Sequence, residues 1–165
     1  MRVGILGILA VFLLLPVIYS CGYALHGKTS LPFHAIRIEG IENGTDEPKL
    51  EDKLIVALTD EFLREGISVV PGAEYSLRGR IDVFELRTLS EKSDLAVAYE
   101  LVMRGSFRIA GPAGYEREVK DVASPFIVSF PGEGPLSMLL SEKERASEKA
   151  VREMAAHVVA AILYR

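Results

Sequence analysis

The alternation of apolar and polar residues between Leu95 and Ile109 constrains the fold most. Successive side chains of a strand point to opposite faces of a sheet, whereas a helix repeats about every 3.6 residues. Polar residues such as Glu100 and Arg104 separate the apolar ones, so the segment is predicted to be a strand with one buried and one solvated face. The apolar face carries Leu95, Val97, Tyr99, Leu101, Met103, Gly105, Phe107 and Ile109.

Two neighbouring segments are predicted to pair with this strand. Residues 75–83 alternate in the same way, and the phase slips near Phe84 and Leu86, which indicates a β-bulge. A polar link over residues 88–94 joins the two long strands, and a turn rich in Gly and Pro leads into a further strand over residues 115–119. The three strands are therefore expected to form an antiparallel meander.

Two segments have the apolar spacing of helices. The first is expected to be capped by Thr45 or Asp46 and to end at Gly66, where glycine permits a left-handed backbone. The closing helix is expected to begin near Ser137 or Ser141 and to present an apolar, alanine-rich stripe.

The order of these segments predicts the fold class. An alternating strand over residues 33–41 precedes the first helix, residues 67–70 form a short strand or strand approach, and residues 124–135 form a loop with a short extended piece. The expected fold is α+β, a two-layer sandwich in which a mostly antiparallel or mixed four-stranded sheet has two helices packed on one face.

The start of the chain has the pattern of a secretory signal that ends at a lipid anchor. Arg2 is followed by an apolar run over residues 3–18, and the small Ser20 directly precedes Cys21. The run is short for a membrane span, which takes about 20 apolar residues. We expect cleavage before Cys21, whose thiol would then carry the lipid. An uncleaved anchor helix, or a cut elsewhere that leaves a free buried thiol, are the alternatives.

These features divide the chain into a removed signal peptide (1–20), a lipidated tether (21–32) and a single domain (33–165). The net charge is −4 for the whole chain, and loss of Arg2 makes the mature protein more acidic still. An acidic domain lacks the basic field that nucleic-acid binding needs, so no nucleic-acid partner is expected. Cys21 is the only cysteine, so no disulfide is expected.

Motifs that would indicate catalysis are absent from the sequence. It has no Gly-x-Ser-x-Gly elbow, no phosphate-binding loop with Lys and no His-Glu-x-x-His pattern. His26, His34 and His157 are scattered, and we expect them to be solvated or hydrogen-bonded histidines, with no metal site. The sequence therefore predicts a protein that is not an enzyme and has no cofactor apart from the covalent lipid at Cys21.

Arginines on the polar face of the long strands are the candidate binding residues. Like charges that face each other across strands cost free energy unless acidic neighbours or an anionic partner balance them. Guanidinium groups suit phosphate, so one hypothesis is a site for the head group of an anionic lipid. The alternative is an ordinary solvated face, neutralised by Glu74, Asp82 and Glu100. The candidate donors are Arg78, Arg80, Arg104 and Arg108.

The motif Cys21-Gly22-Tyr23-x-Leu25-x-Gly27 resembles the lipidated end of the LptE-like lipopolysaccharide-assembly lipoproteins. The order of the expected elements matches that family over the whole mature chain. Because Gly22 is not the Asp that retains many bacterial lipoproteins in the inner membrane, the resemblance also implies an outer-membrane anchor. It implies a non-catalytic subunit that plugs an outer-membrane β-barrel translocon, helps to assemble it and contacts lipopolysaccharide.

The expected function is therefore that of an outer-membrane lipoprotein of the lipopolysaccharide transport translocon. Its body would lie on the periplasmic side of the membrane or within the barrel lumen. The main alternative is an auxiliary or scaffolding lipoprotein of another envelope transport or secretion complex. A hydrolase of envelope polymers is a more distant third reading.

Overall fold

The structure is a computed structural model that describes residues 33–92, 95–123, 128–131 and 135–164. The leader, Cys21 and the tether lie outside the described residues. The elements in chain order are β1 (Ala35–Asn43), α2 (Leu50–Arg64), β2 (Ser68–Val69), β3 (Tyr75–Lys92), β4 (Leu95–Ala110), the 3₁₀ turn η2 (Pro112–Gly114), β5 (Glu116–Ala123), β6 (Val128–Pro131) and α3 (Leu136–Leu163).

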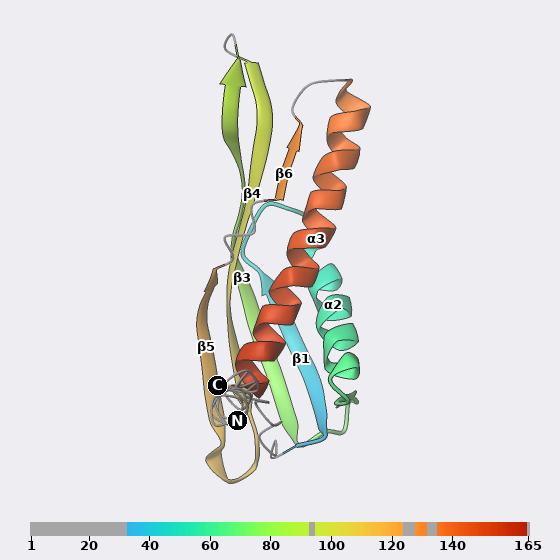
Figure 1. Ribbon diagram of the computed structural model, residues 1–165. Helices are drawn as coiled ribbons and strands as arrows, with labels where there is room; N and C mark the ends of the chain where they lie inside the picture. The colour runs from blue at the N-terminus through green and yellow to red at the C-terminus, as the bar shows by residue number, and fades with distance from the viewer. Residues whose placement is uncertain (1–32, 93–94, 124–127, 132–134, 165) are drawn as a thin grey trace, which may run out of the picture.

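One mixed sheet forms the first layer and two helices form the second, as the sequence predicted (Figure 1). The strand order is β2-β1-β3-β4-β5, and β6 pairs with β4 off this path. β1 runs parallel to β2 and β3, and the other pairings are antiparallel. The sheet has six strands instead of the expected four, because the short β2 and β6 also join it.

The meander of β3, β4 and β5 confirms the strand pattern, and the bulge lies close to its expected place. The β3–β4 register shifts between Ile81 and Val83, after which Phe84 and Leu86 share the face of Met103. The hairpin is longer than the sequence suggested, since β3 continues to Lys92. Backbone pairing does not require apolar side chains, so the polar residues of the expected link take part in the strands.

The core lies between the sheet and the helices. α2 buries one stripe of four residues and ends at Arg64, and Gly66, with a φ of 80°, carries the chain away just after the cap residue Glu65. α3 buries small residues such as Ala150 and Ala155 beside larger ones such as Met154 and Ile162. Small side chains let the two helices pack closely on the sheet. The α2 stripe is Leu50, Leu54, Leu58 and Phe62.

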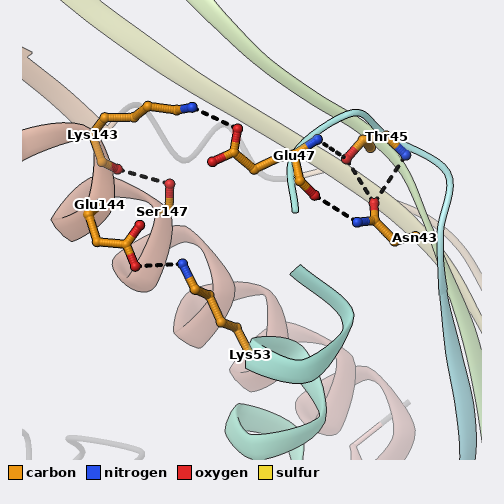
Figure 2. A network of polar contacts seen from close by, with 7 residues as sticks. All are labelled: Asn43, Thr45, Glu47, Lys53, Lys143, Glu144 and Ser147. Carbon is orange, nitrogen blue, oxygen red and sulfur yellow. Dashed lines mark hydrogen bonds and ion pairs between the residues drawn. The ribbon is translucent and has the colours of Figure 1, made fainter. Parts of the chain in front are cut away.

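The entry into α2 differs from the expected cap. The helix begins after Lys49, which has a left-handed φ of 62° and makes no side-chain cap bond, so neither Thr45 nor Asp46 is the cap. The side chain of Asn43 organises the loop instead, accepting from the N–H (3.0 Å) and hydroxyl (2.8 Å) of Thr45 and donating to the Glu47 carbonyl oxygen (2.7 Å; Figure 2). The polar side chain at the end of β1 therefore fixes the turn.

Two ion pairs join α3 to this region, one to the loop before α2 and one to the first turn of α2 (Figure 2). Lys143 Nζ lies 2.7 Å from Glu47 Oε2, and Lys53 Nζ lies 2.6 Å from Glu144 Oε1. The first turns of α3 extend beyond this level, alongside the distal half of the β3–β4 hairpin (Figure 1). That end of the molecule is therefore a sheet with a single helix.

Candidate functional site

The arginines lie on the face of the sheet opposite the helices. Arg78 is directly opposite Arg108 in the β3–β4 register, Arg80 occupies the next outward position of β3, and Arg104 is opposite Val83. The four arginines are exposed, whereas alternate residues such as Leu77, Ile81 and Phe107 are buried in the core. The structure thus brings together all four residues that the sequence selected, on one surface that we call the arginine face: Arg78, Arg80, Arg104 and Arg108.

Glu39 of β1 connects two arginines at one edge of this surface. Its carboxylate accepts from Arg78 Nε and from Arg37 Nη2, the latter at 2.6 Å. The hydrogen bonds from Arg37 and Arg78 hold the pKa of Glu39 below its usual range, because they favour the ionised carboxylate. The parallel pairing of β1 with β3 brings this acid to the site.

Acidic residues of three strands balance two other arginines. Arg80 lies 3.1 Å from Glu42 of β1 and 3.3 Å from Asp82 of its own strand. Arg108 lies 3.1 Å from Glu116 of β5. These pairs are exposed to water, where ion pairs contribute roughly 0–1 kcal/mol each, so exchanging the carboxylates for another anion costs little.

Arg104 differs from the other three. Within the part of the chain that the structure describes, no carboxylate lies within ion-pair distance of its guanidinium, although Ala123 of β5 and Val83 of β3 flank it in the sheet. Of the three acids expected to neutralise the face, only Asp82 pairs with one of the four arginines, while Glu74 and Glu100 do not. The described neighbours therefore leave a positive charge at Arg104 unbalanced.

A shallow hollow of about 390 Å³ lies over the centre of the arginine face. Three of the arginines border it, and two glutamates lie at its rim, so it offers both donors and acceptors. Its lining residues are Glu42, Arg78, Gly79, Arg80, Ser106, Phe107, Arg108 and Glu118.

The acidic partners Glu39, Glu42, Glu116 and Glu118 are the site residues that the sequence analysis missed. Their own alternation shows only that they point outward. For Glu39 and Glu42 the missing information was which strand lies beside β3, because β1 comes from a distant part of the chain and pairs with β3 in parallel. Glu116 and Glu118 lie on β5, the third strand of the predicted meander, so their outward positions in that strand were the signal that could have found them.

Other sequence candidates lie outside this surface. Cys21 and His26 are outside the described residues, while His34 and His157 are exposed at separate places. Over the described ranges there is no group of three or more His, Cys, Asp and Glu side chains that could hold a metal ion. None of the helices described is long and apolar enough to cross a membrane.

Comparison with known proteins identifies related folds only. No protein-family model and no curated protein matches the sequence. Rare lipoprotein B of Shewanella oneidensis is similar in structure (TM-score 0.55, 14% identity), with 76% of this chain and 92% of that chain covered. A PelC variant from Paraburkholderia phytofirmans, described as a dodecamer, has a TM-score of 0.51 and 14% identity, covering 81% of this chain and 90% of that one.

A Xanthomonas campestris protein gives a TM-score of 0.51 at 12% identity, with 79% of this chain and 85% of that chain covered. At these identities the similarity shows the fold alone. The two-layer body described above is thus a fold found among bacterial lipoproteins.

Proposed function

We propose that this chain is an outer-membrane lipoprotein, anchored through lipid on Cys21, that serves as a non-catalytic subunit of a lipopolysaccharide transport translocon. The resemblance of residues 21–27 to LptE-like proteins suggests this role, and the fold, shared with a bacterial lipoprotein, is compatible with it. In this role the body plugs a β-barrel partner and helps it to assemble. No cofactor beyond the covalent lipid takes part.

The observation that carries the proposal is the charge arrangement of the arginine face. Arg78 and Arg108 are neighbours across two strands, and Arg104 has no acidic partner among the described residues. Phosphate groups of lipopolysaccharide accept paired hydrogen bonds from guanidinium groups, and binding would offset the repulsion between the arginines. We assign the glycolipid contact to Arg78, Arg80, Arg104 and Arg108.

The same face also suits a barrel lumen. Its exposed side chains are mostly charged, as expected of a surface that lies against a water-lined, polar barrel interior. The helices occupy the other side of the sheet (Figure 1).

Binding of a phosphorylated glycolipid tests the arginine assignment. Arg104→Ala combined with Arg108→Ala should weaken binding by the full-length protein at least several-fold, because both variants remove guanidinium donors. Arg145→Ala is the matched control, since Arg145 is 77% exposed on α3 and pairs with Glu142. Equal binding by the double variant and the parent protein would contradict the assignment.

Copurification tests the wider role. A mild-detergent pull-down from envelopes of the source organism should recover a large β-barrel in equal proportion, together with glycolipid. Recovery of inner-membrane transport components without a barrel would instead favour an auxiliary or scaffolding lipoprotein of another envelope complex.

A further inference from the structure

One edge of the sheet is open at the distal half of the hairpin. β1 accompanies β3 only as far as the pair Asn43–Ile81, and no strand in the described part of the chain lies on that side of β3 beyond this point. Register shifts bound the open segment, one between Ile81 and Val83 and the next after Thr88. Residues 83–88 thus form a regular strand between two irregularities. On the side away from β4, the backbone N–H and C=O groups of this strand have no described strand to pair with.

Other edges of the described sheet carry features that discourage pairing. β5 contains Lys120 and, beside it, Asp121 with a left-handed φ of 47° at a register shift. β2 is only two residues long, and β6 ends at Pro131. Bulges, charged side chains (lysine above all), prolines and short strands are the usual protections of sheet edges. Between its bounding irregularities the open segment of β3 has no lysine, proline or bulge, and its only charged residues are Glu85 and Arg87.

Apolar surface adjoins the open edge. Leu86, in the middle of the open segment, is 39% exposed and shares a hollow of about 190 Å³ with Tyr99, Leu139, Leu140 and Lys143. Leu140 is itself 58% exposed. This end of the molecule extends beyond α2 (Figure 1), so that helix does not cover it.

The order of charges along the segment indicates the occupant. Glu85 and Arg87 point to the same face on either side of Leu86, and they pair with each other at 2.9 Å. If a second copy of the segment pairs antiparallel about Leu86, each Glu85 lies opposite the Arg87 of the other copy, and the two Leu86 side chains face each other. Opposite charges directly across strands stabilise such a pair. Shifting the centre to Arg87 would place the two arginines opposite each other.

We propose that residues 84–88 of β3 form an antiparallel, two-fold symmetric strand pair with a second copy of this chain, centred on Leu86. The bulges on either side bend the strands apart, which limits the contact to this segment. So short a pairing buries less than the roughly 1,600 Å² of a standard stable interface, so we expect monomer and dimer in equilibrium. This proposal is independent of the proposed function.

A disulfide across the two-fold axis tests the geometry. Residues directly opposite in antiparallel strands have Cα atoms about 4.5–5.5 Å apart, which suits a disulfide. The full chain with Cys21→Ser and Leu86→Cys, in mild detergent with an oxidant, should form a covalent dimer several-fold faster than a control with Cys21→Ser and Val56→Cys. Val56 is 61% exposed on α2, away from the edge. Equal rates for the two variants would overturn the proposal.

Charge reversal distinguishes pairing between two copies of this chain from the loss of the Glu85–Arg87 pair within one strand. In the Leu86→Cys protein, Glu85→Arg alone and Arg87→Glu alone should each slow cross-linking, because like charges then face each other. Mixing the two variants should restore the cross-linking rate, because residue 85 of one copy then faces an opposite charge at residue 87 of the other. Within each strand residues 85 and 87 still carry like charges, so only pairing between copies explains the recovery. Failure of the mixture to recover would overturn the proposal, as would cross-linking of Leu86→Cys in solubilised envelopes to a different protein and not to itself.

Discussion

The ring of Phe107 lies against Gly79 on the neighbouring strand, so closely that a Cβ on Gly79 would be 2.4 Å from a ring carbon. Phe107 is almost fully buried, so the ring is held within the core. Gly79→Ala should therefore destabilise the protein by about 1–3 kcal/mol through overpacking. Gly72→Ala is the control, because nothing lies within 4 Å of its Cβ position. Urea denaturation of both variants measures the difference, and similar midpoints would contradict the packing described.

The contacts of Glu39 predict a pH-dependent contribution to stability. Arg37 and Arg78 hold the pKa of Glu39 below its unfolded value, so the ionised carboxylate is favoured in the folded state. This stabilisation is present above a pH of about 4.5 and is lost as the pH falls through the lower, folded pKa. Glu39→Gln should thus reduce the free energy of unfolding at about pH 7 and make less difference at about pH 3. With Arg37→Ala already present, the effect of Glu39→Gln at neutral pH should be smaller.

The hydroxyl of Tyr164 donates to Glu65 Oε2 at 2.7 Å and joins the ends of the two helices. This hydrogen bond raises the pKa of Tyr164, because ionisation of the phenol would remove the donor and place a second negative charge beside Glu65. The phenol should therefore titrate above its ordinary value of about 10, and Glu65→Gln should lower the pKa towards that value.

The chain has six tyrosines, so the difference between the parent and Tyr164→Phe titrations isolates this group. The stabilising contribution of the Tyr164–Glu65 hydrogen bond is present below pH 10 or so and disappears as the pH rises through the folded pKa of Tyr164. An unchanged tyrosine titration in Glu65→Gln would argue against the contact.

Asn43 and Asp46 should respond differently to replacement by alanine. The Asn43 side chain bonds groups of Thr45, Glu47 and Glu51, and Asn43→Ala should cost about 1–2 kcal/mol by leaving part-buried polar groups unsatisfied. Asp46 is exposed, and among the described residues it makes no such bond, so Asp46→Ala should change stability by no more than about 0.5 kcal/mol. Denaturation of the two variants distinguishes the observed loop from a capping role for Asp46.

Sequence patterns were enough to predict the layers of this fold. Alternation identified the long hairpin, and the phase slip near Phe84 located the bulge, because side-chain direction follows directly from the strand period. The start of α2 was not predictable in the same way. Thr45 and Asp46 have the chemistry of caps, but the hydrogen bonds of Asn43 stabilise a longer loop before Lys49.

The candidate site was predictable as far as the arginines themselves. Their spacing placed Arg78 and Arg108 on one face, and the antiparallel register sets them opposite each other. Their acidic partners on β1 depended on strand order, and local patterns do not determine which distant strand lies beside β3. Glu39 and Glu42 therefore entered the site only with the tertiary structure, whereas Glu116 lies on the third strand of the predicted meander.

The parallel pairing of β1 with β3 has a consequence for the order of events during biosynthesis. Until Tyr75 and the residues after it have followed, β1 can pair only with the two residues of β2, and the core remains uncovered until α3, which follows every strand, supplies Met154, Val158 and Ile162. Such long-range contacts slow folding, because the chain must close large loops before they form. The complete sheet and its core therefore form only after α3 has been synthesised.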